Sequence, residues 1–269
     1  MTRRHFLQAS LLAAPALLLS VQTRAADTRI AHINDAINKS GRQRMLSQRL
    51  AKGYLQIGQA IDMPRSQKLF NVSLALFEKQ LSELESYAPN AENRATLASL
   101  KKTWSAYKNT LLGKTPNLED AKNVMRLSEE VLAQAHASTL QLEKLSDTSV
   151  GHLVNIAGRQ RMLSQRMAKF YQAINWGVTS AEALPGLIKA RDEFLAAMAE
   201  LSASPKNTTA IKQDILLAQQ QWFFFDQALK SNAVNEETRL RFATNVATSS
   251  ERIPVSYTHL RAHETGRNL

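Results

Sequence analysis

The chain has 269 residues, enough for one large domain or two ordinary ones, and it contains no cysteine, which excludes disulfides, thiolate zinc sites and cysteine nucleophiles. Its formal net charge of +11 invites a nucleic-acid-binding or membrane-binding interpretation. Helix-forming residues dominate, with only 9 glycines and 7 prolines, so we predict an all-α fold.

Residues 1–26 have the features of an export signal. Arg3 and Arg4 precede an apolar run over 11–21 that is too short to span a bilayer, and a small-residue cleavage site follows. The segment resembles a twin-arginine signal peptide. We therefore expect a soluble mature protein in the periplasm, with an uncleaved membrane anchor as the alternative.

Four helices are predicted in the first half of the mature chain. Helical spacing covers 27–62 and ends before Pro64. Apolar positions then mark helices over 69–84, over 90–113 and from Asn117 through Leu142, with short turns between them. This pattern predicts an up-down four-helix bundle over 27–146.

One stretch of the first helix occurs again in the second half. Asn38–Lys52 reads NKSGRQRMLSQRLAK and Asn155–Lys169 reads NIAGRQRMLSQRMAK, and nine consecutive residues are identical at an offset of 117. We call the stretches box 1 and box 2. They carry nine cationic residues and no acidic one, whereas the rest of the mature chain is slightly acidic. The excess charge is therefore local, which favours a specific anion site over nucleic-acid binding.

The second half repeats the plan of the first. A loop over 177–186 is followed by predicted helices over 187–201, over 206–230 and from 236 onward. We predict a second bundle over 147–254 with an aromatic core, in which the run Trp222–Phe225 is also a candidate interface. The last 15 residues, 255–269, depart from helical spacing, and we interpret them as a non-native tail. Matched core residues support the duplication: Phe77 with Phe194 at an offset of 117, and Trp104 with Trp222 at 118.

Two arrangements of the bundles are compatible with the sequence. A turn over 146–149, with Asp147 or Ser149 capping the next helix, places the bundles side by side with parallel box helices. A continuous helix over 117–176, a stretch without proline, stacks them end to end. In the stacked arrangement each box needs a mate from a second chain in a homodimer.

A helical wheel separates the residues of box 1 into three faces. One stripe is the bundle core, and a second apolar row contains Arg44 as its single charge, as Arg161 is in box 2. The third face carries Arg42, Arg49 and Lys52 and is predicted to be solvated. Because burying an unpaired guanidinium costs several kcal/mol, the two arginines require an anionic or acidic partner.

The planar guanidinium group matches two oxygens of a flat oxyanion such as carboxylate or nitrate. We hypothesise that Arg44 and Arg161 face one another across a pseudo-twofold axis and clamp a small planar anion. The alternative is that they reach solvent or pair with core acids, in a helical interaction or structural protein without a small-molecule ligand. Secondary candidates for anion binding are Gly41, Gln48, Gly158 and Gln165.

No motif in the chain indicates catalysis. There is no nucleophile with an adjacent base, no phosphate loop and no metal-ligand spacing. His32, His136 and His152 are expected at the surface or at its boundary. We therefore expect no enzymatic activity, no cofactor and no metal.

The sequence INKSGRQRMLSQRLAK resembles the signature of the PilJ-type periplasmic sensor domain of pilus chemotaxis transducers, and it is similar to the P-box helix of nitrate/nitrite sensor kinases. The resemblance covers both units, from about Asp27 to Ile253. It implies four-helix bundles that dimerise through their first helices, with one arginine from each P-box holding nitrate or nitrite at the interface. Matched by position, these arginines are Arg44 and Arg161.

The chain departs from that family pattern in two ways. Arg42-Gln43 and Leu46 stand where nitrate sensors carry other residues, so the resemblance is less specific for the ligand than for the domain. The flanking transmembrane helices and the kinase, methyl-accepting or cyclase modules of family members are not found. We therefore expect a free-standing tandem sensor that binds a small anion and reports to a membrane receptor or kinase.

Overall fold

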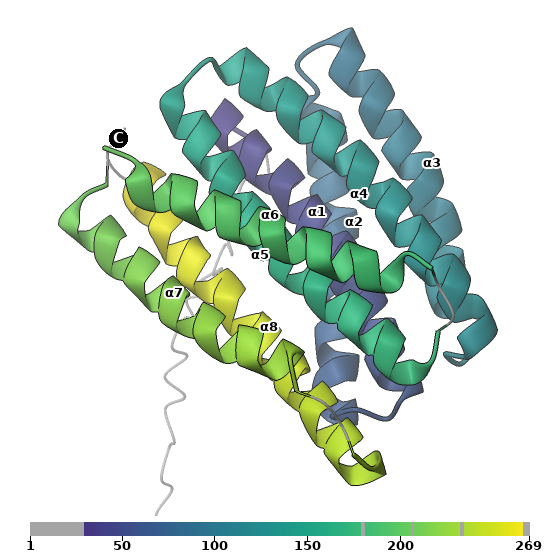
Figure 1. The fold of residues 1–269 in the computed structure, drawn as a ribbon. Helices are drawn as coiled ribbons and strands as arrows, with labels where there is room; N and C mark the ends of the chain where they lie inside the picture. Colours follow the sequence, from purple (N-terminus) through teal and green to yellow (C-terminus); the bar gives the residue numbers. More distant parts are fainter. Residues whose placement is uncertain (1–29, 179–180, 206, 232–233, 266–269) are drawn as a thin grey trace, which may run out of the picture.

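A computed structural model describes residues 30–178, 181–205, 207–231 and 234–265, with the side chains of Ser149, Val150 and 254–265 left aside. Within these residues the regular structure consists of eight helices and no strand, which confirms the all-α prediction (Figure 1). None of these helices is both long and apolar enough to cross a membrane. The predicted export signal over 1–26 lies outside the described residues.

The first four helices form one bundle. They are α1 (Ile33–Gly58), α2 (Met63–Tyr87), α3 (Ala91–Gly113) and α4 (Leu118–Ser146). Helix α1 packs against α2 and α4, and α3 packs against α4. Asn90 and Asn117 accept hydrogen bonds from main-chain amides in the first turns of α3 and α4, so both predicted caps are confirmed.

The last four helices form the second bundle. They are α5 (Ser149–Trp176), α6 (Ala183–Ala203), α7 (Thr209–Leu229) and α8 (Glu236–Thr265). Helix α5 packs against α6 and α8, and α7 packs against α8.

Two boundaries in the second bundle differ from prediction. The loop predicted over 177–186 is shorter, because α6 begins at Ala183 with Pro185 in its first turn, where no amide donor is required. Helix α8 continues to Thr265, so the departure from helical spacing at Val255 does not end it. Whether 255–269 is native stays a prediction.

The two cores are built alike. The ring of Phe77 stacks on Trp104 with centroids 3.9 Å apart, and Phe194 stacks on Trp222 at 4.5 Å. Both phenylalanines are fully buried. The run Trp222–Phe225 is divided, because Trp222 and Phe225 are buried whereas the two phenylalanines between them are exposed.

A turn between α4 and α5 places the bundles side by side, so the stacked arrangement is wrong. Asp147 ends α4 in the left-handed conformation with φ 46°, and the hydroxyl of Thr148 accepts a hydrogen bond from the amide of Gly151 at the start of α5. The cap is therefore Thr148, whereas the sequence suggested Asp147 or Ser149.

The two box helices, α1 and α5, run parallel along the centre of the molecule, with α3 and α7 at opposite edges (Figure 1). Near the start of both helices, Gly151 faces Ile37, and near their ends Gly58 lies against the ring of Trp176. Contacts with nearly the same offset at both ends establish the parallel direction. The two bundles are thus related by a pseudo-twofold axis between α1 and α5.

Candidate functional site

Helices α1 and α5 approach one another closely at two box glycines. A Cβ on Gly158 would stand 3.9 Å from the Cα of Gly41, 3.2 Å from Nη2 of Arg44 and 3.8 Å from Nη2 of Arg161. The two Nη2 atoms are therefore at most 7.0 Å apart, the sum of the 3.2 and 3.8 Å separations. A glycine inside a helix costs about 0.5–1 kcal/mol relative to alanine. Here the glycines leave the space that the guanidinium groups fill.

Arg44 is completely buried at this crossing. Its Nη1 lies 3.2 Å from Nδ1 of His136, and its Nη2 donates to the main-chain oxygen of Asn155 at 3.2 Å. Since a guanidinium can only donate, Nδ1 of His136 accepts, which places the proton of the neutral imidazole on Nε2. The Nε of Arg44 has no hydrogen-bond partner among the residues that the structure describes.

Arg44 is not neutralised by a carboxylate within salt-bridge distance among the described residues. Glu143, the acid that most affects it, is instead hydrogen-bonded to His152 and to the side chain of Asn155. Burial lowers the pKa of Arg44 to about 10, and the positive charge of Arg159 acts in the same direction. Arg44 therefore remains charged at neutral pH.

Arg161 occupies the matching position on α5 and is 4% exposed. Its Nη2 donates to Oδ1 of Asn38 at 3.2 Å. Asn38 and Asn155 correspond at the offset of 117, so each arginine reaches across to the other box's asparagine. The structure thus brings together the two arginines that the helical wheel singled out.

The glutamines of the two boxes anchor each box helix to its own bundle. The side-chain amide of Gln43 donates to the main-chain oxygen of Phe77, and Gln160 donates in the same way to Phe194. The secondary candidates behave likewise, with Gln48 donating to the oxygen of Ser128 at 2.9 Å and Gln165 to that of Ser250 at 2.8 Å. The glutamines predicted as secondary ligands are thus one turn from the arginines and already hydrogen-bonded.

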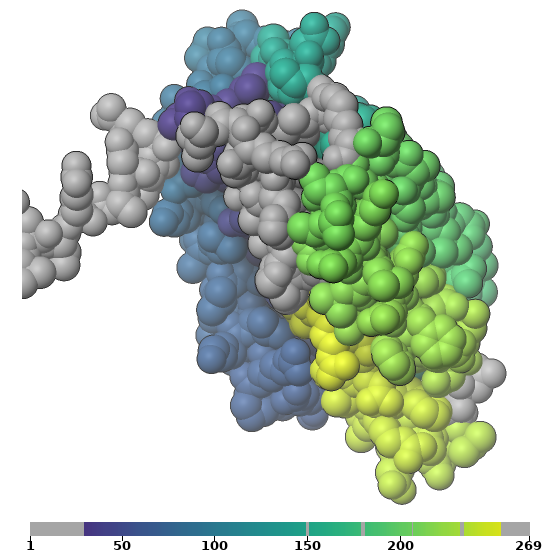
Figure 2. Space-filling model, turned by 90° about the vertical axis from the view of Figure 1, so that its left-hand side faces the viewer, coloured from purple at the N-terminus to yellow at the C-terminus, as the bar shows by residue number. Residues whose placement is uncertain are grey.

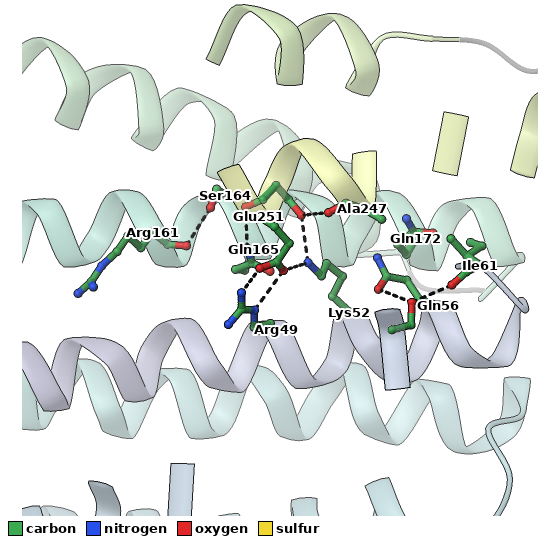
Figure 3. Close-up of polar contacts among 12 residues, drawn as sticks. Arg49, Lys52, Gln56, Ile61, Arg161, Ser164, Gln165, Gln172, Ala247 and Glu251 are labelled. Atoms are coloured by element: carbon green, nitrogen blue, oxygen red, sulfur yellow. Dashed lines mark hydrogen bonds and ion pairs between the residues drawn. The ribbon is translucent and has the colours of Figure 1, made fainter. Parts of the chain in front are cut away.

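The face of box 1 that was predicted to be solvated is largely covered by the other bundle. Arg49 and Lys52 form ion pairs with Glu251 of α8, and Lys52 also donates to the hydroxyl of Ser250 at 3.0 Å (Figure 3). Lys52 is 2% exposed. The prediction of solvation is therefore wrong for these two residues. A helical wheel of α1 alone cannot show that α8 of the second bundle packs against this face.

Box 2 makes the reciprocal contacts. Arg166 and Lys169 form ion pairs with Glu129 of α4, and Lys169 donates to the hydroxyl of Ser128 at 3.0 Å. Burial acts to raise the pKa of Glu129, but Lys169 and Arg166 outweigh it and hold the pKa at about 2. Burial lowers the pKa of Lys169 to about 8.

These contacts leave a net positive charge in the seam, by which we mean the interface that α1 and α4 of the first bundle form with α5 and α8 of the second. Each ion cluster sets two basic groups against one carboxylate, and the two arginines lie one to two turns before the clusters on the same helices. Such a seam can hold a small anion. Among the described residues no group of three His, Cys, Asp or Glu side chains could hold a metal ion.

Sequence reasoning missed three kinds of seam residue. His136 was expected at the boundary and is half-buried as expected, but nothing in the sequence indicated its contact with Arg44. The box asparagines were not singled out. Glu129 and Glu251 did have a signal, because the dipeptide Ser-Glu occurs at 128–129 and again at 250–251.

The family model that matches the chain does so twice, over residues 28–141 and 145–248, and its description is type IV pili methyl-accepting chemotaxis transducer N-terminal domain, PilJ. No curated protein and no solved structure matches the chain. The PilJ domain is a sensory, signalling domain and not an enzyme family. With most of its length covered by two successive matches, and with the duplicated box helices packed together at the centre of the molecule, the chain belongs to the PilJ family.

Proposed function

We propose that this protein is a periplasmic sensor module that binds a small planar oxyanion, with nitrate or nitrite as the leading ligand, between Arg44 and Arg161. The observation that supports this most is the pair of buried guanidinium groups, whose Nη2 atoms lie no more than 7.0 Å apart. Within the described part of the chain, no carboxylate lies within salt-bridge distance of Arg44. Two facing cations repel, and an anion between them removes that repulsion.

The present contacts of the arginines are exchangeable. The hydrogen bonds of Arg44 to His136 and Asn155, and that of Arg161 to Asn38, are each 3.2 Å long and go to neutral acceptors. A charge-assisted hydrogen bond to an oxyanion is roughly twice as strong as a neutral one. An anion would therefore replace these weaker contacts with stronger ones.

Anion binding where α1 crosses α5 would affect how the two bundles are positioned relative to each other. The anion would tie α1 to α5 at the level of Gly41 and Gly158, and the ion clusters further along these helices connect them to α8 and α4. A small shift at the crossing is thus passed to the outer ends of both bundles. A membrane receptor or kinase is the partner that would read this change.

The proposal is tested by calorimetry and thermal melting in sodium nitrate, sodium nitrite and sodium chloride at equal ionic strength. Nitrate or nitrite should release heat and raise the melting temperature, because a ligand that binds only the folded state stabilises it. The double variant Arg44→Lys, Arg161→Lys keeps both charges and loses the planar forks, so the shift should disappear.

Arg126→Lys is the matched control, since Arg126 is exposed and forms an ion pair with Glu130 along α4. It should keep the full response to the anion. If none of the small oxyanions gives heat with the unmodified protein, the arginines are structural cations. The alternative function, a helical interaction or structural protein without a small-molecule ligand, is then favoured. Capture of a membrane receptor that is indifferent to nitrate and to the double lysine variant would point the same way.

A further inference from the structure

The outer helices of the two bundles carry different surfaces. Helix α7 exposes four large apolar side chains, with exposed fractions of 44% to 59%. They are Leu216, Leu217, Phe223 and Phe224. At the offset of 118 that aligns Trp222 with Trp104, helix α3 carries Ala98, Ser99, Ser105 and Ala106 at these positions, all exposed. The first bundle therefore forms the same fold without apolar residues at these positions. Folding of the bundle does not explain why α7 exposes them.

The apolar face of α7 is also uncharged. No charged residue lies between Asp214 and Asp226, whereas the corresponding stretch of α3 contains Lys101 and Lys102. An uncharged face offers nothing to an acidic or basic partner, and it lacks the basic side chains that bind an anionic membrane. It is complementary to another uncharged apolar face, of which this chain itself supplies one.

The spacing on α7 is symmetric about Gln220. The leucines lie three and four residues before it, and the phenylalanines lie three and four residues after it. At 100° per residue, the four side chains fall within 60° of the direction of Gln220. Exposed Gln213 and Gln227, seven residues to either side, continue the same line. Read in either direction, this face shows glutamine, an apolar pair, glutamine, an apolar pair and glutamine.

A face that reads the same in both directions suits an antiparallel pairing of two identical helices. In such a pair, a residue that lies a given number of positions before the twofold axis in one copy meets the residue that lies the same number of positions after it in the other copy. We propose that α7 binds α7 of a second copy of this chain, antiparallel, with the twofold axis at Gln220. The leucines of one copy then pack on the phenylalanines of the other, and the glutamine amides, which both donate and accept, pair across the axis.

The position of α7 leaves this surface free. Helix α7 lies at the edge of the molecule away from α1–α4 (Figure 1), and residues of α6, α7 and α8 form part of the face seen in Figure 2. The arginine centre lies between α1 and α5, so the pairing neither uses nor blocks it. The proposal therefore stands independently of anion binding.

The absence of cysteine from the chain makes a direct test possible. In the variant Gln220→Cys of the full chain, the two thiols meet on the twofold axis, within reach of a disulfide. We expect mild oxidation to convert most of the protein into a covalent dimer, and analytical ultracentrifugation of the unmodified chain to show dimer formation that increases with concentration. Lys102→Cys, at the matched position of α3, is the control: it keeps the α7 face and should still form the non-covalent dimer, but it should not be cross-linked.

A second variant separates loss of the interface from loss of the fold. Phe223→Ser with Phe224→Ala gives α7 the residues of α3 at two exposed positions. Melting at low concentration, where the unmodified chain is monomeric, should therefore be unchanged, while dimer formation and cross-linking through Gln220→Cys are lost. The proposal is overturned if the unmodified chain is monomeric at all concentrations, or if Gln220→Cys is cross-linked no faster than Lys102→Cys. Cross-linking that persists in the double variant also overturns it.

Discussion

The two bundles are almost identical where they face each other and differ where they face outward. On the box helices, Gln43 and Gln160 each bind the carbonyl of a matched phenylalanine in their own bundle. Across the interface between the bundles, Lys52 and Lys169 each bind the serine and glutamate of the opposite bundle's last helix. On the outer edges, α3 is polar where α7 is apolar.

The difference shows which residues the fold fixes. A seam residue takes part in a reciprocal contact, so a change in one bundle leaves a buried group of the other without its partner. An outer residue contacts only its own bundle or solvent, and its replacement costs little. The identical stretch of the two boxes thus marks the buried interface. Within it, Arg44 is a buried cation with no carboxylate in salt-bridge distance among the described residues.

The largest effect should come from the matched cores. Phe77→Ala and Phe194→Ala each remove a fully buried ring that stacks on a tryptophan, and each should lower the free energy of unfolding by about 3–5 kcal/mol in urea denaturation. Phe223→Ala is the control, since an exposed side chain away from such contacts changes stability by about 0.5 kcal/mol or less. Costs for the two buried residues that differed by more than about 2 kcal/mol would contradict equal cores.

The next effect tests the reciprocity of the seam. Glu129→Gln and Glu251→Gln each leave two largely buried cations without a carboxylate, and each should cost about 3 kcal/mol of unfolding free energy. Both are measured by the same denaturation.

The neighbouring Glu130 supplies the matched control, because it pairs with Arg126 on the exposed side of α4. Glu130→Gln should change stability by about 0.5 kcal/mol or less. A small loss of unfolding free energy at one of the two glutamates, Glu129 or Glu251, and a large loss at the other would show that the two ion clusters do not stabilise the protein equally.

Stability should also fall in acid through Glu129. The pKa of this carboxyl is held at about 2 in the folded protein against an ordinary value of 4.5. Its contribution is therefore complete above pH 4.5 and is lost as the pH falls through 2. Of the roughly 3 kcal/mol by which Glu129→Gln lowers the unfolding free energy at pH 6, we expect about 2 kcal/mol, allowing for the partial exposure of Glu129, to disappear near pH 2. A difference independent of pH would assign the effect to packing instead of charge.

The helices and their caps could be predicted from the sequence, whereas the contacts between the two bundles could not. The duplication, the eight helices and the caps at Asn90 and Asn117 follow from local spacing, which depends on one helix at a time. The placement of Arg49 and Lys52 failed because it depends on α8, about 200 residues away in the chain. The two arginines were found because their isolation in an apolar row is itself a local feature.

The smallest effect concerns the turn between the bundles. Thr148→Ala removes the hydroxyl that caps α5 and should cost about 1 kcal/mol, the usual value for such a cap. Thr208→Ala, which removes the equivalent cap of α7, is the control and should cost the same. Because the arginine crossing and the two ion clusters join the bundles independently of the turn, neither variant should alter the response to nitrate. A much larger cost at Thr148, measured by thermal denaturation, would mean that the turn itself holds the bundles side by side.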